Sequence, residues 1–239
     1  MKNKLFKVVL NVVFLFLILM NTFSYAKEIS ETDLSFQKYL GYIEEGILSA
    51  EVSYDQWRRL VIESYELEKN LSISNQFYEV YSSESSNNPG FVLQEGDILI
   101  TNGASYAGII GHSGIAIGSS NILHILKGGS PRDISLYEWC RNYSNKREGI
   151  YTKVYRHINK SVGREAAIWA INNYLGSDAF YFIDNDLWKT KYTYCSKLVW
   201  QAYFFGPEPA EAKDIIYGPI DPYELPDLIY DLKLEHIYE

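Results

Sequence analysis

One short stretch constrains this chain more than any other: Gly111 to His124, with the sequence GHSGIAIGSSNILH. Serines in its middle separate two β-prone runs, which predicts a hairpin. Side chains alternate between the two faces of a strand, so every second residue after His112 shares its face. Those residues carry little or no side chain: Gly114, Ala116 and Gly118. Something bulky can therefore approach this face closely, either a helix or a bound molecule.

The length of the turn decides whether His112 and His124 lie on the same face. A two-residue connection at 119–120 places Ile115 opposite His124, and the histidines then point to opposite sides. A three-residue connection at 118–120 pairs Gly114 with His124 and makes the histidines diagonal neighbours on one face. Gly-Ser-Ser matches no strong hairpin rule, so the residues leave both registers open. A site that uses both histidines requires the second register or a bulge.

The second constraining feature is Cys195, in the run YTYCSKLVWQAY. Apolar residues three, four and seven positions further on predict a helix that begins at this cysteine. A thiol at a helix N-terminus feels the positive end of the helix dipole, which favours the thiolate. The N–H groups there can receive an oxyanion. With a histidine nearby, Cys195 is a candidate nucleophile. The alternatives are a buried structural thiol or a disulfide with Cys140, which is otherwise interpreted as structural.

At this point the sequence resembles a known family. The segment HSGIAIG-SSN-ILH resembles the histidine strand and following strand of papain-like NlpC/P60 cysteine hydrolases, and GDIL at Gly96–Leu99 resembles the strand before them. Because the cysteine helix comes last here, the chain is similar to the circularly permuted branch with YiiX/YaeF-like proteins and the lecithin:retinol acyltransferase group. The resemblance covers roughly residues 92–206. It implies Cys195 as nucleophile, His112 as base and His124 as third member, with Tyr192 or Tyr194 polarising the carbonyl.

Around these motifs the sequence predicts an α+β fold, with a small antiparallel sheet packed on helices and a helical segment before it. Helices are expected within 30–85 and at 135–143, 161–175 and 195–205, and strands at 98–100, 150–157 and 233–238. The run SSESSNNPG at 82–90 reads as a linker. The predicted domains are therefore a signal peptide at 1–26, a helical segment and linker at 27–88, and a permuted NlpC/P60-like catalytic domain at 89–239.

The first residues predict export. Three lysines precede an apolar run from Val8 to Met20, and Ser24-Tyr25-Ala26 offers a cleavage site after Ala26. The run is short for a membrane span, so we expect a secreted or cell-envelope protein with no stable membrane span after processing. Removing three lysines makes the remainder more acidic than the whole chain's net charge of −8. That charge argues against nucleic acid or an anionic membrane surface as a partner.

The leading functional prediction is an exported cysteine peptidase or amidase that needs no cofactor or metal. It would cleave an amide bond in cell-wall peptides, such as a peptidoglycan stem peptide, or in small peptide and amino-acid amides. A lipid acyl hydrolase or acyltransferase with the same site is the first alternative, because aromatic residues before the cysteine would line an acyl groove: Phe180, Tyr181, Phe182 and Trp188. The others are a non-catalytic exported binding module and a zinc site of His112, His124 and Cys195, whose spacing matches no compact zinc signature.

Overall fold

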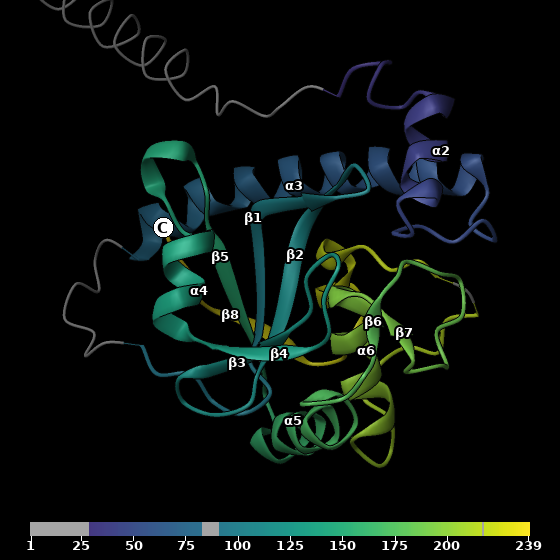
Figure 1. Ribbon diagram of the computed structural model, residues 1–239. Coiled ribbons are helices and arrows are strands. Elements are labelled where there is room, and N and C mark those ends of the chain that lie inside the picture. Colours follow the sequence, from purple (N-terminus) through teal and green to yellow (C-terminus); the bar gives the residue numbers. More distant parts are fainter. Residues whose placement is uncertain (1–28, 83–90, 217) are drawn as a thin grey trace, which may run out of the picture.

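The computed structural model describes residues 29–82, 91–216 and 218–239. The predicted signal peptide and most of the predicted linker lie outside these residues. At the centre is a six-stranded sheet with the order β4-β3-β2-β1-β5-β8, in which every neighbouring pair is antiparallel (Figure 1). Its strands are β1 (Ile98–Tyr106), β2 (Ile109–Ala116), β3 (Asn121–His124), β4 (Arg132–Ser135), β5 (Thr152–His157) and β8 (Leu232–Tyr238).

Helices surround this sheet, and the predicted α+β class is confirmed. They are α2 (Phe36–Glu44), α3 (Tyr54–Ser82), α4 (Leu136–Tyr143), α5 (Lys160–Tyr174), α6 (Cys195–Phe205) and the short α7 (Leu225–Leu228). Alternate residues of β1 enter different cores, as the two-residue period of a strand requires. Ile98 and Ile100 join a large cluster with α5 and α6, whereas Leu99 joins a smaller one with Trp139 of α4. The sheet therefore separates α4 from α5 and α6.

Two helix ends show how closely local signals determine this fold. The Ser135 side chain caps α4 by accepting a hydrogen bond from the Glu138 N–H at 3.1 Å, as the sequence predicts. The helix α6 begins at Cys195 and ends at Phe205, also as predicted. The thiol therefore stands in the first turn of a helix whose following residues are buried among the core.

The dipeptide Asn102-Gly103 is typical of turns and predicts one here, but this prediction is wrong. The strand β1 continues through it, and a register shift between Thr101 and Ser105 absorbs the irregularity. The chain reverses at Ala107-Gly108 instead, where φ is 53° and 82°. Positive φ at two consecutive residues matches the twist of a two-residue hairpin turn. The glycine at 108 was the better turn signal.

The N-terminal helices pack directly on the sheet. The Trp57 indole N–H of α3 donates to the Ala107 carbonyl at 2.7 Å, and the Ile110 N–H donates to Ser64 Oγ at 3.1 Å. Leu60 and Val61 share the large core with the sheet. The proposed division between 27–88 and 89–239 stays a prediction. Within the described ranges, no helix combines the length and apolar character needed to cross a membrane.

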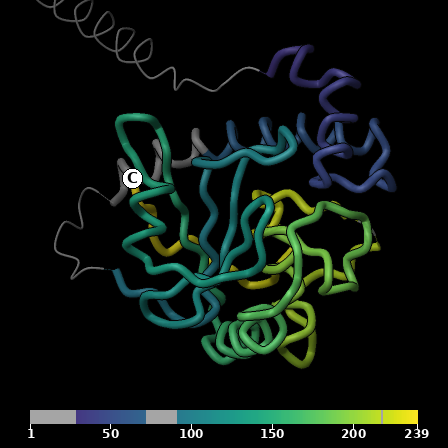
Figure 2. The backbone as a smooth tube through the Cα atoms, in the orientation of Figure 1, coloured from purple at the N-terminus to yellow at the C-terminus, as the bar shows by residue number. Residues whose placement is uncertain are grey.

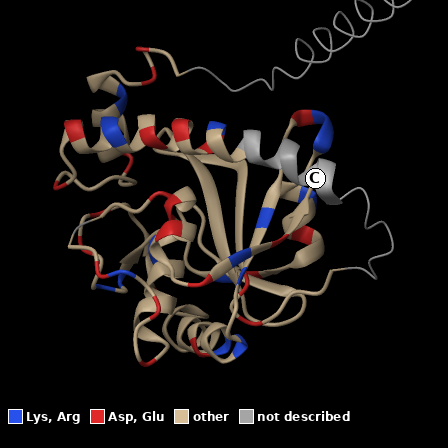
Figure 3. Cartoon of the chain, turned by 180° about the vertical axis from the view of Figure 1, so that it is seen from behind, with Lys and Arg blue, Asp and Glu red and all other residues tan. Residues whose placement is uncertain are grey.

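The end of the chain forms an edge strand of the central sheet. The strand β8 pairs with β5, and Lys146 Nζ lies 2.7 Å from Glu239 Oε2 beside the connection between α4 and β5 (Figure 2). Charged side chains recur along α3 and in the loops, while the central strands β1 and β2 carry none (Figure 3). These two strands therefore supply no carboxylate that could balance a positive charge formed on one of their own side chains.

Candidate active site

The two histidines meet on one face of the sheet. Ile115 pairs with Leu123, and the Ile117 N–H donates to the Asn121 carbonyl at 2.9 Å, so the hairpin has the three-residue connection 118–120. His112 Nε2 lies 2.9 Å from His124 Nδ1. The register that a two-histidine site requires is therefore the one the chain adopts.

Both rings of this pair are neutral at pH 7. Burial lowers the pKa of His112 well below its ordinary value, and neighbouring His124 lowers it further. Burial also lowers the pKa of His124 to about 4, with a further contribution from Arg132. One proton lies between the rings. When His112 donates it from Nε2, its Nδ1 keeps a lone pair and can accept a proton. That nitrogen is buried and has no hydrogen-bond partner among the described residues.

The face of small residues is occupied by a helix. A Cβ at Gly114 would lie 3.0 Å from Trp139 Cζ3 and 2.6 Å from Ile122 Cγ2, so only glycine allows this packing. The Trp139 ring stacks on the His112 ring, with centroids 5.4 Å apart and planes 18° apart. Of the two occupants that the sequence allows for this face, a helix or a bound molecule, α4 is the one found.

Cys195 lies beside the backbone of the histidine strand. Its thiol accepts hydrogen bonds from the backbone N–H groups of Ser113 and Ser196. Ser113 directly follows His112, and because side chains alternate along a strand, the His112 ring lies on the other face of the sheet, against Trp139. Tyr106 forms a second link, because its ring lies 6.2 Å from the His112 ring and also lines the pocket at Cys195. In the described residues, His112 Nδ1 makes no hydrogen bond to the thiol.

The thiol is protonated at rest, which corrects the expectation from the helix dipole. Burial raises the pKa of Cys195, and the hydrogen bonds from Ser113 and Ser196 offset this only in part. The sequence shows that the cysteine begins a helix, but it does not show that the first turn is covered. Cys195 therefore needs a base before it can act as a nucleophile.

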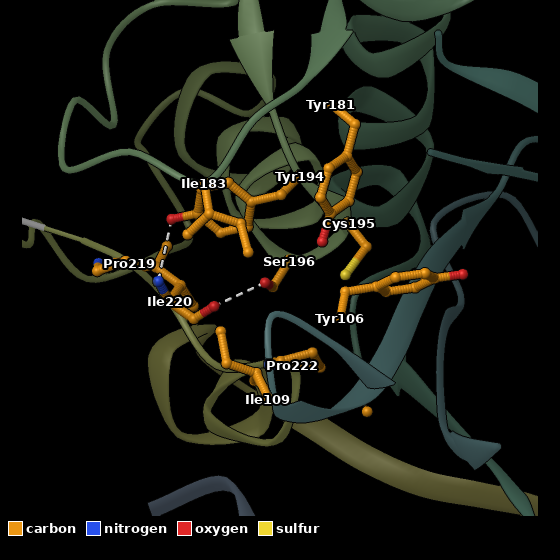
Figure 4. Close-up of a pocket in the computed structure, with 11 residues that line it drawn as sticks. Tyr106, Ile109, Tyr181, Ile183, Tyr194, Cys195, Ser196, Pro219, Ile220 and Pro222 are labelled. Atoms are coloured by element: carbon orange, nitrogen blue, oxygen red, sulfur yellow. Dashed lines mark hydrogen bonds between the residues drawn. The ribbon is translucent and has the colours of Figure 1, made fainter. Parts of the chain in front are cut away.

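An apolar pocket opens on the thiol (Figure 4). Its cavity volume is about 20 Å³. Besides Tyr194, Cys195 and Ser196, its walls come from three other parts of the chain: Tyr106, Ile109 and Gly111; Tyr181 and Ile183; and Pro219, Ile220 and Pro222. No charged side chain is among these lining residues.

The C-terminal wall of the pocket is tied to both neighbours of the cysteine. The Ile220 N–H donates to Tyr194 Oη at 3.0 Å, and Ser196 Oγ donates to the Ile220 carbonyl at 2.7 Å (Figure 4). One peptide segment, more than twenty residues downstream, thus fixes the residues on each side of Cys195. The position of the thiol depends on this tail as well as on its own helix.

The tyrosine best placed beside the sulfur is one that sequence reasoning did not choose for this role. The Tyr181 hydroxyl points toward Cys195 Sγ (Figure 4). Burial raises the pKa of Tyr181 well above its ordinary value, so it is a neutral donor. Tyr194 lines the pocket, but its hydroxyl accepts the Ile220 bond. Tyr192 is 43% exposed and is not a lining residue. Parallel pairing of β6 (Phe180–Tyr181) with β7 (Tyr192–Thr193) brings Tyr181 to the site, a contact that local spacing does not reveal.

The other aromatic residues before the cysteine do not line this pocket. Phe180 is 43% exposed and Trp188 is 51% exposed. The acidic residues of the same loop are paired with lysines: Asp178 with Lys191 at 2.9 Å, Asp186 with Lys189 at 2.8 Å and Asp184 with Lys197 at 2.9 Å. Both cysteines are free thiols, so they form no disulfide with each other. Among the described residues, no group of three or more His, Cys, Asp or Glu side chains is placed to hold a metal ion.

A family model described as "Lipoprotein N-acylation protein LnsA-like" matches residues 57–238, from α3 to the end of β8. The chain belongs to the LnsA-like family. The matched region contains both histidines and Cys195. It also contains most of α3, which the resemblance to NlpC/P60 hydrolases does not cover.

An uncharacterized 30.3 kDa protein of Bacillus thuringiensis is 37% identical over 147 residues, which are 58% of this chain. The chain spans about half of that relative, 54% of its length. Among solved structures, the metalloprotein yiiX from Escherichia coli O157:H7 matches at 17% identity with a TM-score of 0.36, over 50% of this chain and 69% of that one. That likeness is below the level at which two folds are taken as the same. The circular permutation of an NlpC/P60 domain stays a prediction.

Proposed function

We propose that this LnsA-like chain is a thiol acyltransferase that takes an acyl group from a lipid onto Cys195 and passes it to an amine. The observation that carries the proposal is the placement of Cys195 in an apolar pocket, where its thiol is hydrogen-bonded to Ser113, the residue after the paired His112. The family description, lipoprotein N-acylation, supports an amine of a lipoprotein as the acceptor. When water takes the place of the amine, the same site is an acyl hydrolase.

The first half-reaction forms a thioester. His112 Nδ1 takes the proton from Cys195 Sγ, and the sulfur attacks the acyl carbonyl of the lipid ester. The carbon–oxygen bond of the ester breaks, and the imidazolium of His112 returns its proton to the departing alcohol. His124 accepts the Nε2–H of His112 throughout, which leaves Nδ1 as the nitrogen that takes up and returns protons.

The second half-reaction regenerates the thiol. The acceptor amine attacks the thioester carbonyl while His112 removes a proton from its nitrogen. The carbon–sulfur bond breaks, and Sγ regains a proton from His112. The products are an amide and the free enzyme, so no oxidant, reductant or further reactant is needed.

Two kinds of donor are available for the oxyanion of each step. The first backbone hydrogen bond within α6 runs from the Leu198 N–H to the Tyr194 carbonyl at 2.9 Å. No side chain caps the N-terminus of this helix. The N–H groups before Leu198 in the first turn therefore make no hydrogen bond within the helix. The neutral Tyr181 hydroxyl beside the sulfur is the second donor. Preorganised donors of this kind are each worth about 2.7–4 kcal/mol to a transition state.

The amide hydrolase of cell-wall peptides, favoured by the motifs, uses the same residues. A stem peptide carries charged ends, and the lining residues of this pocket include no charged side chain to bind them. The cavity is small, but its isoleucine and proline walls are apolar, as the reacting end of an acyl chain requires. A lipid donor is therefore the better match. Action outside the cytoplasm, predicted from residues 1–26, is part of this proposal.

The test compares two substrates on one protein. The purified full-length chain is incubated with diacyl phospholipid vesicles or with peptidoglycan stem peptides, and Cys195 is examined by peptide mass mapping. We expect an acyl thioester on Cys195 from the vesicles, which a synthetic lipopeptide with a free N-terminal amine then discharges as an amide. Cys140→Ser is the matched control and keeps this activity, while Cys195→Ala loses it. If Cys195→Ala forms as much product as the unchanged protein, the mechanism is wrong. If the protein turns over the stem peptide and not the vesicles, the substrate is a peptide and not a lipid.

A further inference from the structure

We propose that Trp139 of α4 is a positioning residue for His112. Its indole ring fixes the imidazole and stabilises the positive charge that the ring gains when it takes the Cys195 proton. This inference rests on the proposed role of His112 as base. It identifies a part of the site that neither the motifs nor the family assign.

The positive charge on His112 has no counter-charge from a carboxylate in contact with it. His112 is fully buried, and among the described residues no Asp or Glu forms a hydrogen bond or ion pair with either ring of the histidine pair. The polar and ionisable groups whose rings contact His112 come from three elements: Tyr106 of β1, His124 of β3 and Tyr143 of α4. Arg132 and Asp133 of β4 act on His124 with opposite signs. A positive charge on this ring therefore meets aromatic rings and His124 rather than an anion.

Aromatic rings take the place that a carboxylate has in many histidine sites. The indole of Trp139 lies nearly parallel to the His112 ring, 18° between planes and 5.4 Å between centroids. Tyr143 lies 5.4 Å away at 49°, and Tyr106 presents an edge contact at 6.2 Å and 77°. A cation within about 6 Å of an aromatic face is attracted by the ring quadrupole, and tryptophan is the strongest of the three aromatic residues. A neutral imidazole feels much less of this attraction, so the stack favours the protonated ring.

The indole is held in place from three sides. Its Nε1–H donates to Thr152 Oγ1 at 3.0 Å, and Thr152 Oγ1 donates to the Tyr143 carbonyl at 2.8 Å. The bare Gly114 backbone lies under the ring and allows the close approach. The ring is completely buried. A fixed stacking partner restricts the His112 ring to one orientation, in which Nε2 faces His124.

The experiment changes the electron density of the indole without changing its shape. Tryptophan and its mono-, di- and trifluorinated analogues are placed at position 139 of the full-length chain. The rate of Cys195 alkylation by iodoacetamide is then measured against pH, with mass mapping to separate Cys195 from Cys140. Each fluorine weakens the quadrupole, so we expect the rate at neutral pH to fall stepwise. Across the series the total decrease is about tenfold.

Two substitutions complete the set. Trp139→Leu removes the aromatic face, and we expect the neutral-pH rate to fall by about tenfold or more while its inflection moves to higher pH. Thr152→Val removes the indole hydrogen bond but keeps the face, and it retains most of the rate. Melting temperatures of all variants are measured in parallel. If the fluorinated series alkylates Cys195 at one common rate, Trp139 contributes packing alone and the inference is wrong.

The failure of this inference differs from failure of the proposed function. Fast alkylation that requires His112, together with no response to fluorination, removes only the role of Trp139. Alkylation that is equally fast in His112→Ala removes the base itself, and the inference with it.

Discussion

The most demanding prediction concerns Lys197, which is fully buried two residues after Cys195 in α6. Its ammonium donates to Asp184 Oδ1 at 2.9 Å, to the Tyr192 carbonyl at 2.7 Å and to the Asp186 carbonyl. All three donors of the group are therefore used. They hold the loop that leads into the cysteine against the helix that the cysteine begins.

Lys197→Met leaves the buried Asp184 carboxylate and two carbonyls without this donor. Removing one partner of a buried ion pair costs about 3–5 kcal/mol. For a chain of this size that loss corresponds to a decrease in melting temperature of roughly 6–20 °C. The magnitude depends on pH in a defined direction. Burial raises the pKa of Asp184, so at mildly acidic pH the carboxyl group takes up a proton and the cost of the substitution decreases.

The assay is urea unfolding at pH 7 and at pH 5, followed by tryptophan fluorescence. Lys189→Met is the matched control, because the exposed Lys189–Asp186 pair is worth at most about 1 kcal/mol. Asp184→Asn combined with Lys197→Met costs less than Lys197→Met alone, since no carboxylate is left unpaired. A Lys197→Met cost below 1 kcal/mol, or one that matches Lys189→Met, refutes the reasoning.

Three further predictions concern the site itself. Folding lowers the pKa of His124 from 6.5 to about 4. The neutral ring therefore contributes roughly 3 kcal/mol of stability above pH 6.5, and this contribution is lost as the pH falls toward 4. Measuring the free energy of unfolding against pH shows the loss, and His124→Asn removes this pH dependence. Gly114→Ala costs about 1–3 kcal/mol in urea unfolding because its Cβ meets Ile122 and Trp139, whereas Gly118→Ala, with nothing within 4 Å, is close to neutral. Tyr181→Phe lowers kcat for acyl transfer by about a hundredfold to a thousandfold with KM little changed, and an unchanged kcat removes the hydroxyl from the oxyanion site.

Much of the fold could be predicted because its signals are local. The Ser135 cap, the start of α6 at Cys195 and the late strand at the C-terminus each depend on a few adjacent residues. The register of the histidine hairpin was different. Gly-Ser-Ser specifies no turn type, so the choice between two registers depends on packing of the whole sheet. The sequence shows which register a two-histidine site requires, but it does not decide which of the two registers the hairpin adopts.

The parts of the site that escaped prediction all depend on contacts between distant segments. Tyr181 reaches Cys195 through a two-residue parallel pairing, and Ile220 reaches both neighbours of the cysteine from the tail. The protonation state of the thiol depends on what covers the first turn of α6. The helix dipole can be deduced from the sequence, but burial, which here has the larger effect on the pKa, cannot.

The bonds from Ile220 to Tyr194 and Ser196 also have a consequence for the timing of biosynthesis. The ribosome makes the nucleophile, both histidines and Tyr181 before it makes Ile220, and the strand β8 is completed only at Tyr238. A nascent chain released at residue 210 contains every residue of the proposed chemistry, but its pocket has no third wall. If the chain has the proposed function, we expect its activity to begin only after the last segment of the chain has been synthesised and folded.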